Sequence, residues 1–389
     1  MKQTAPSEEV RDLMIQFAEK TGISTPKTLP KRYLWTDAFA VCNFLTLYRQ
    51  TGDEEYIRLA LNLIDQVHNV LGKHRADDPR TGWISGFSDE ERQRHPTAGG
   101  LRIGKPLPER GPTDPYDDQS EWDRDGQYFH YLTKWMHALC RTSMVTGNPQ
   151  YCRWAVELAQ AAHDGFRTLP QPDGKKLLYW KMSIDLSYPL VPSMGLHDPL
   201  DGLITYHELS LCTQKFTGAL TGPDLTWELT DAATMCEGQH WETTDSLGIG
   251  GLLCDAYRVV QMTAKGQANM SGLLLALLRA SQYGLGVLAS HDHLNDPPEY
   301  RLAFRELGLS IGLKAIANMR DIVTAHPDLF DYSLAQDLEG LMAHVPLIEI
   351  IEDFWRKPTN QHQESWLDHR DINMVMLATS LSPEEFLSV

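Results

Sequence analysis

Apolar side chains recur along the chain with the three-to-four-residue spacing of amphipathic helices. One such stripe runs through residues 34–50 and a second through residues 54–72. Between them stands Thr51-Gly52-Asp53, in which the glycine can end one helix and the aspartate can cap the next. The pattern therefore predicts a helical hairpin with a three-residue turn.

The same order of helix, short turn and helix recurs through the rest of the chain. With an opening and a closing helix it gives six pairs, each an outer helix followed by an inner one. Repeated units of this kind indicate stacked hairpins, so the sequence predicts an all-α (α/α)6 barrel as a single domain over residues 1–389. The inner helices are expected at residues 34–50, 124–145, 202–219, 246–264, 303–319 and 366–381. The outer helices are expected at residues 7–21, 54–72, 268–289 and 332–345, and in segments that open near Tyr151 and Trp227.

Long connections lead into the inner helices, whereas the connections that leave them are mostly short. The long ones cover residues 73–123, 168–201, 290–302 and 346–365. We therefore expect them at one end of the barrel, where the inner helices begin, and long irregular loops in compact domains are usually functional. Loop 73–123 could be a lid or an oligomer contact, and the alternation in residues 177–188 allows a small β-hairpin.

Two neighbouring segments resemble a known superfamily. Trp35-Thr36-Asp37-Ala38-Phe39 and the turn from Tyr48 to Tyr56 are similar to the corresponding parts of unsaturated glucuronyl hydrolases, which belong to the six-hairpin glycosidase-like proteins. The N-acylglucosamine 2-epimerases are similar in architecture. The resemblance implies an (α/α)6 barrel that acts on saccharides.

Acidic residues gather where loop 73–123 meets the second inner helix. Glycoside chemistry uses two carboxylates about 5–10 Å apart across the sugar. Asp123 and Asp125 are two residues apart and would diverge on one helix, so we expect Asp125 to pair with Asp37 of the first inner helix. Asp123 is a further catalytic candidate, although it could simply be the helix N-cap, and Asp125 could be a solvated first-turn acid.

Aromatic, histidine and arginine side chains occur near the starts of all the inner helices, a mixture suited to sugar binding. His369 is a candidate acid/base catalyst, and the third inner helix adds Asp198, Asp201 and Glu208 to the acidic candidates. The helix N-termini, together with Arg32, Arg102, Arg124 and Arg370, would also favour an anionic substrate. The expected substrate-binding residues are Trp35, Arg102, Trp122, Tyr128, Tyr206, His207, Trp241, Trp366 and Arg370.

Other functions remain open from the sequence. A sugar epimerase would use His369 and a second histidine as an acid/base pair. Asp117-Asp118-x-x-Glu121 matches the Mg²⁺ motif of class I terpene cyclases, and Asp231, Thr234 and Glu237 come near that family's second motif. His291-x-His293 is a weak metal signal because it lacks a third ligand at fixed spacing. A non-catalytic binding protein is a further alternative. We expect no metal ion and no cofactor.

The bulk properties narrow the possible partners. The formal net charge of −17 disfavours binding to nucleic acid or to anionic membranes. Residues 1–10 lack the apolar core of a signal peptide, and no stretch is expected to reach the ~20 apolar residues of a membrane span. The six cysteines form no CxxC pair, which is typical of small buried side chains in a reducing compartment. We therefore expect a cytoplasmic enzyme with a small-molecule, saccharide substrate, and the sequence leaves its oligomeric state open.

Overall fold

The computed structural model describes residues 8–24, 30–168, 176–216, 224–267, 270–290 and 293–389. Two compact units divide the chain, and each is considered by itself. Unit 1 comprises Met1–Phe17, Arg49–Thr51 and His240–Val389, and unit 2 comprises Ala18–Tyr48 and Gly52–Gln239. The single domain expected from the sequence stays a prediction.

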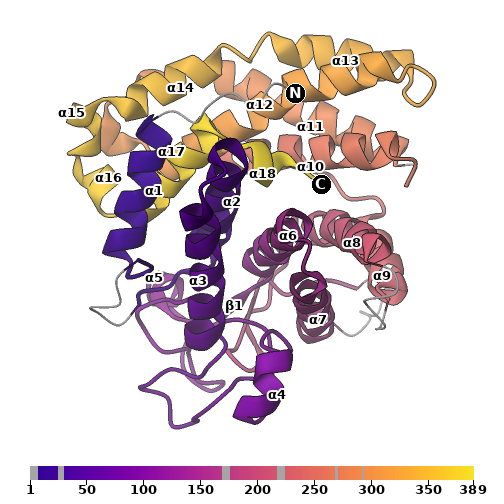
Figure 1. Ribbon diagram of the computed structural model, residues 1–389. Coiled ribbons are helices and arrows are strands. Elements are labelled where there is room, and N and C mark those ends of the chain that lie inside the picture. The colour runs from indigo at the N-terminus through magenta and orange to yellow at the C-terminus, as the bar shows by residue number, and fades with distance from the viewer. Residues whose placement is uncertain (1–7, 25–29, 169–175, 217–223, 268–269, 291–292) are drawn as a thin grey trace. The chain divides into compact units, whose positions relative to one another are not determined.

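Helices dominate both units (Figure 1). The longer ones are, in chain order, α1 Glu8–Lys20, α2 Leu34–Thr51, α3 Glu54–Leu71, α6 Phe129–Thr146, α7 Pro149–Phe166, α8 Asp198–Lys215, α9 Thr226–Cys236, α10 Ser246–Ala264, α11 Ser271–Ser290, α12 Ala303–Ala325, α13 Tyr332–Met342, α14 Leu347–Arg356 and α17 Arg370–Leu381. The short ones are α4 Asp89–Arg94, α5 Asp118–Asp123, α15 Pro358–Gln361, α16 Glu364–Leu367, α18 Glu384–Leu387 and the 3-10 turns η1 His293–Asn295 and η2 Pro298–Tyr300.

Burial separates inner helices from outer ones as predicted. In α2 every residue from Leu34 to Leu47 is buried, so this helix is covered on all sides. In α3 the buried residues form a stripe that includes Leu59, Leu63 and Val67, and the opposite face is exposed. Continuous buried runs also occur in α8, α12 and α17, three of the helices expected inside.

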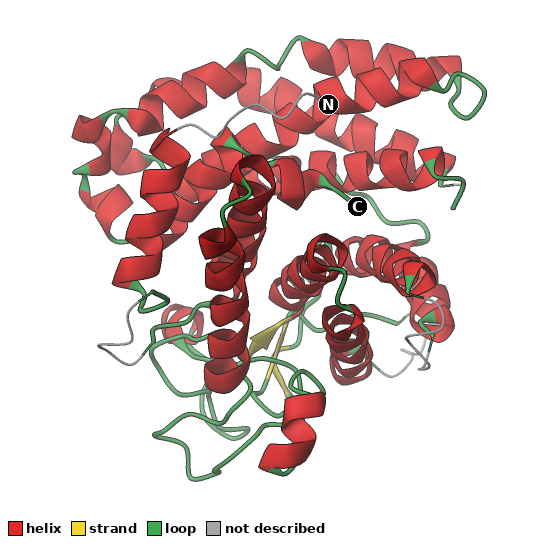
Figure 2. Cartoon of the chain, in the orientation of Figure 1, coloured by secondary structure: helices red, strands yellow, loops and turns green. Residues whose placement is uncertain are grey.

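Within unit 2, α6 packs against α7 and α8, and α8 packs against α7 and α9. A small antiparallel sheet lies beside α6, in strand order β1 Gln127–Tyr128, β2 Lys181–Met182 and β3 Pro189–Val191 (Figure 2). Gln127 is opposite Met182, which joins the end of loop 73–123 to the predicted hairpin. A hairpin is therefore present as expected, but its second strand, Pro189–Val191, lies beyond the predicted range of 177–188.

Within unit 1, α10 and α12 approach very closely because glycines meet at their crossing. A Cβ atom on Gly250 would lie 2.2 Å from the carbonyl oxygen of Gly308, and one on Gly312 would lie 2.5 Å from that of Gly250. Helix α12 also contacts α13, α14 and α17. The end of α2 joins this unit through an ion pair between Arg49 and Glu385 at 3.0 Å.

Two expectations about individual segments are wrong. The second inner helix begins at Phe129 rather than at 124, because residues 127–128 form strand β1 and Gly126, with φ of 151°, takes an extended turn unlike a helix. Helix α11 has the length and the mean hydropathy, 1.4, of a membrane span, which the sequence pattern did not indicate. A single helix of this kind is weak evidence for a membrane span, and α11 packs against α10 and α13 within unit 1. The cytoplasmic location stays a prediction.

Candidate functional site

The first two turns of α6 carry basic side chains that face acidic side chains in the first turn of α8. His130 and Lys134 lie four residues apart on α6, and Asp198 and Asp201 lie three apart on α8, so each pair shares one helix face. His130 Nδ1 is 3.6 Å from Asp198 Oδ1, and Lys134 Nζ is 3.1 Å from Asp201 Oδ1. The His130 side chain is 28% exposed, so solvent reaches this group of residues. We call the four residues the α6–α8 cluster.

Local sequence explains why the two aspartates stand at the start of α8. Pro199 fixes the backbone of the first turn, where its missing N–H costs no hydrogen bond. Acidic side chains are favoured there by the partial positive charge of the helix N-terminus. A Cβ atom on Gly195 would lie 2.5 Å from Asp198 Oδ2, so the glycine leaves room for this carboxylate.

Asp198 has one oxygen that the protein leaves unused. The residue is only 4% exposed, and no residue in the described part of the chain donates a hydrogen bond to its Oδ2 atom. A buried carboxylate oxygen without a donor costs about 1–3 kcal/mol. This oxygen is therefore a buried polar atom that the described residues leave unsatisfied.

Aromatic rings border the α6–α8 cluster. The Tyr128 ring stacks on His130, with centroids 5.4 Å apart, and on its other side approaches Trp180 at 5.4 Å. Tyr131 contacts the Trp35 ring at 6.4 Å, and its hydroxyl lies 2.6 Å from that of Tyr33. Burial raises the pKa of Tyr33 to about 12, so its hydroxyl keeps its proton. We call Tyr33, Trp35, Tyr128, Tyr131 and Trp180 the aromatic cluster.

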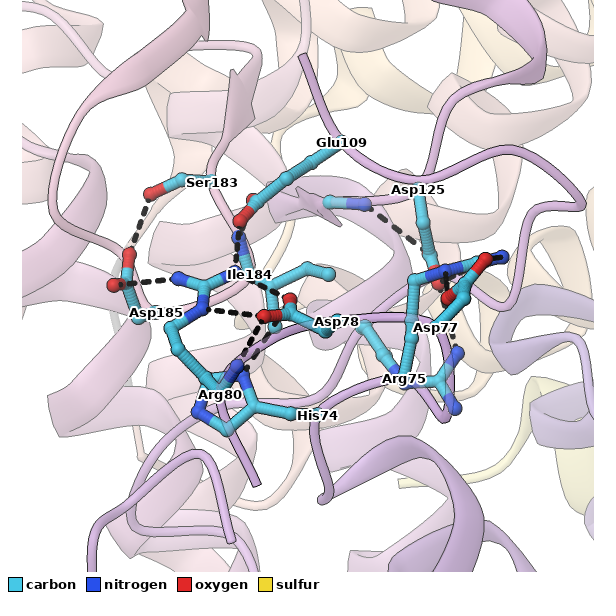
Figure 3. Close-up of polar contacts among 12 residues, drawn as sticks. His74, Arg75, Asp77, Asp78, Arg80, Glu109, Asp125, Ser183, Ile184 and Asp185 are labelled. Atoms are coloured by element: carbon cyan, nitrogen blue, oxygen red, sulfur yellow. Dashed lines mark hydrogen bonds and ion pairs between the residues drawn. The ribbon is translucent and has the colours of Figure 1, made fainter. Parts of the chain in front are cut away.

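Asp125 lies inside the protein with both carboxylate oxygens occupied. Its Oδ2 atom accepts hydrogen bonds from Arg102 at 2.8 Å and from Arg75 at 3.4 Å. Its Oδ1 atom accepts backbone N–H bonds from Gly104, Lys105 and Gly126 at 2.9, 3.3 and 3.1 Å. The side chain is fully buried. Figure 3 shows Arg75 directed toward Asp125 and Asp77. This geometry favours a structural anchor over a general acid.

A second ionic group fastens loop 73–123 to the small sheet. Arg80 pairs with Asp78 at 2.7 Å, with Asp185 at 2.8 Å and with Glu109 (Figure 3). Ser183 also donates to Asp185 at 2.8 Å. Asp78 and Glu109 belong to the loop, whereas Asp185 lies between β2 and β3. The loop is therefore held inside unit 2 by its own charged residues.

The other two predicted catalytic carboxylates also have defined places. Asp37 is 2% exposed, accepts the Tyr33 backbone N–H at 3.1 Å and lies 3.6 Å from Arg32 Nη1, so it closes the first turn of α2. Asp123 is exposed at the last position of α5, so the expectation that it could cap the second inner helix is wrong. A catalytic role for Asp37 or Asp125 stays a prediction that the geometry does not favour.

The predicted substrate-binding residues of unit 2 divide by location. Trp35 and Tyr128 lie in the aromatic cluster, and the Trp122 ring is 51% exposed close to it, beside Lys105. Arg102 is engaged by Asp125 and by backbone carbonyls of residues 70 and 73. Tyr206 is fully buried, and its hydroxyl approaches His163 of the outer helix α7 at 3.4 Å, away from the cluster.

Five predicted residues remain, and burial distinguishes most of them. His207 of unit 2 is half-buried, and burial lowers its pKa. Trp241 and Trp366 of unit 1 are buried, the latter stacked on Trp355 at 5.8 Å. His369, in the turn that opens α17, contacts the Phe304 ring at 5.5 Å, and Arg370 is exposed.

The metal motifs are not assembled as metal sites. Asp117 and Asp118 are exposed, whereas Glu121 turns inward to pair with Lys181 at 2.9 Å and Arg110 at 3.1 Å. The terpene-cyclase interpretation is therefore not supported, since its three carboxylates do not converge. Asp231 of the second motif pairs with His163 and Lys176. His291 lies outside the described residues, within which no group of three ligands is placed to hold a metal ion.

Sequence reasoning missed half of the α6–α8 cluster. It named Asp198 and Asp201, but it did not select His130, Lys134 or Trp180. The signal that could have found the first two is the four-residue spacing of two basic side chains at the start of an inner helix. Trp180 carries no local signal, because it reaches Tyr128 only through the pairing of β1 with β2.

The chain is similar to known proteins in structure but not in sequence. No protein-family model matches the chain, and no curated protein matches it by sequence. A GH76 α-mannanase of Bacteroides thetaiotaomicron matches with a TM-score of 0.54 at 10% identity, over 97% of this chain and 96% of that one. An inactive aspartate-to-asparagine variant of an α-1,6-mannanase of Salegentibacter sp. HEL1_6, in complex with α-1,6-mannotriose, matches with a TM-score of 0.52 at 11% identity, over 98% and 99% of the two chains. At these identities the likeness is one of fold.

Proposed function

We propose that the chain is a carbohydrate-active enzyme whose chemistry occurs at the α6–α8 cluster. Its (α/α)6 fold, which the sequence predicted, is the fold of the six-hairpin glycosidase-like superfamily. The observation that carries the proposal is the pair Asp198 and Asp201, two carboxylates one helical turn apart beside the buried and half-buried rings of the aromatic cluster. The similar structures are named as mannanases, enzymes that act on a saccharide, and this supports a saccharide substrate here.

The proposed reaction is hydrolysis of a glycosidic bond. Side chains three residues apart on a helix have Cβ atoms about 5–6 Å apart, and glycosidases place their two carboxyl groups about 5–10 Å apart. Asp198 would act as the general acid, since it faces His130 at 3.6 Å and its Oδ2 atom accepts no hydrogen bond within the described residues. Asp201, which pairs with Lys134 at 3.1 Å, would act as base or nucleophile.

His130 supports one alternative on the same site. It stacks on Tyr128 and faces Asp198, so it could move a proton at the carbon next to a sugar carbonyl, as an epimerase or isomerase requires. The products separate the two functions. Hydrolysis increases the number of reducing ends and lowers the product mass, whereas epimerisation changes neither.

The test is a screen of oligosaccharides, including α-1,6-mannooligosaccharides, followed by kinetics of Asp198→Asn and Asp201→Asn. Each substitution should lower kcat by about 10²–10⁴-fold, because asparagine cannot transfer the proton. Asp123→Asn is the matched control, since that side chain is exposed at the end of α5. If both cluster variants melt like the wild type and keep near-full activity, the assignment of the pair is refuted.

A further inference from the structure

Lys105 is held in place by the anchor at Asp125. The preceding residue, Gly104, has φ of +94°, and a Cβ atom on it would lie 2.2 Å from the carbonyl oxygen of Arg32. The loop can therefore run tightly against the start of α2 only with glycine at this position. Asp125 accepts the backbone N–H groups of both Gly104 and Lys105, which fixes where the lysine side chain leaves the loop.

The ammonium group of Lys105 lies against aromatic rings rather than against a carboxylate. Its Nζ atom is 4.8 Å from the centre of the Trp122 ring and 5.6 Å from that of Tyr33. Within the ranges that the structure describes, no acidic side chain lies within ion-pairing distance of this atom. Burial lowers the pKa of Lys105, although Asp123 and Asp125 oppose the shift. The cation has lost part of its water without gaining an ionic partner.

Several other cations near the candidate site already have partners. Lys134 pairs with Asp201, and Lys181, fully buried, pairs with Glu121. Arg102 binds Asp125, and Arg32 donates to the carbonyl of Thr21 and lies beside Asp37. Of the arginines that the sequence suggested for anion binding, Arg32 and Arg102 are thus used inside the fold. Arg124 donates to the carbonyl of Pro108 at 3.3 Å, and Arg370 is exposed. Unlike Lys134 and Lys181, Lys105 has no ionic partner among the described residues and can attract an anion from solution.

We propose that Lys105 binds an oxyanion substituent of the saccharide (a carboxylate, sulfate or phosphate) while the sugar ring packs on Trp122. The inference rests on the proposed function in placing a saccharide at this site. Ring contacts connect the subsite to the α6–α8 cluster, from Tyr33 to Tyr131 at 5.6 Å and from Tyr131 to His130 at 4.8 Å. The substrate class is therefore an acidic rather than a neutral saccharide.

The experiment measures equilibrium binding, which does not require turnover. Glucose, glucuronate, glucose 6-sulfate, glucose 6-phosphate and inorganic sulfate are titrated into the full chain by calorimetry. At least one sugar anion should bind about tenfold more tightly than glucose, and Lys105→Met should remove that preference. Lys105→Arg should retain part of it. Lys73→Met is the matched control, because this lysine also lies over a tryptophan, Trp83, at 4.2 Å.

The outcomes separate the inference from the proposed function. Equal affinity for glucose and every sugar anion, or a preference that Lys105→Met leaves unchanged, overturns the inference. Inorganic sulfate bound as tightly as the sugar anions overturns the saccharide part of it. A preference lost in Lys105→Met but kept in Lys73→Met supports the subsite, even if the oligosaccharide screen shows no turnover and the proposed function fails.

Discussion

Replacement of Asp125 by asparagine should destabilise the protein rather than remove a catalytic proton. The carboxylate receives two guanidinium groups on one oxygen and three backbone N–H groups on the other. Asparagine keeps one acceptor oxygen and places an NH2 group where the second oxygen was. That NH2 group must then face either the arginines or the backbone amides, all of which are donors.

The loss of stability in Asp125→Asn can be estimated from the ion pairs that Asp125 makes with Arg75 and Arg102. Breaking a buried ion pair by removing one charge costs about 3–5 kcal/mol. Unfolding entropies of about 2.1 cal/mol/K per residue convert this loss to a fall in Tm of about 4–6 °C for a chain of 389 residues that unfolds in one transition. Asp123→Asn, two residues away and exposed, should change stability by no more than about 0.5 kcal/mol.

The assay is thermal and urea unfolding followed by circular dichroism, with kcat measured on the same samples once a substrate is known. If Asp125→Asn melts within a degree of the wild type, the anchor role is refuted. Loss of turnover in such a stable variant would restore Asp125 as the catalytic acid that its place in the sequence suggested. A lowered Tm with residual activity supports the structural role.

Two further predictions concern stability. Gly104→Ala should lower the free energy of unfolding in urea by about 2–3 kcal/mol, because the methyl group would meet the Arg32 carbonyl oxygen. Gly82→Ala is the control, since Gly82 has φ of +82° but open space around it, and it should lower the free energy by about 1 kcal/mol. Equal losses in the two variants would contradict the close approach at Gly104. His68 accepts a hydrogen bond from Trp135 at 3.2 Å, and burial lowers its pKa to about 3. Histidine in the unfolded chain titrates near pH 6.5, so between about pH 6.5 and 3 only the unfolded chain binds this proton. The free energy of unfolding should therefore decrease as the pH is lowered through that window, by up to about 1.4 kcal/mol per pH unit. His68→Gln should flatten the fall in urea midpoint between pH 7 and 5, and an unchanged slope would show that other groups cause it.

The helices were predictable where their ends are determined locally. Gly52, with φ of +71°, ends α2, and Asp53 caps α3 by accepting the Glu55 backbone N–H at 3.0 Å. Gly147 and Asn148 do the same between α6 and α7. These residues act on neighbours in the chain, so their signal is visible in the sequence.

The start of α6 and the role of Asp125 depend on distant partners instead. Gln127 pairs with Met182, 55 positions further along the chain, and Asp125 binds Arg75, 50 positions back. Helical periodicity depends only on the spacing of apolar positions and carries no information about such pairings. The prediction therefore began α6 too early in the chain and placed Asp125 in its first turn. Asp198 and Asp201 could be named because they follow a long loop, whereas their partners on α6 could be found only from the packing of two helices.

The anchors at Arg102 and Asp125 also divide the long connection between α3 and α6 into two smaller closed loops. Arg102 returns to the carbonyl oxygens of Val70 and Lys73, and Asp125 returns to the amides of Gly104 and Lys105. Closing a flexible loop costs entropy that grows only with the logarithm of its length, about 0.6 kcal/mol per doubling. A change of length in the exposed turn at Phe87–Glu90 would thus add little closure entropy, provided that Arg80 kept its pairs with Asp78 and Asp185. The second loop, which carries Lys105, would keep its own closure at Asp125.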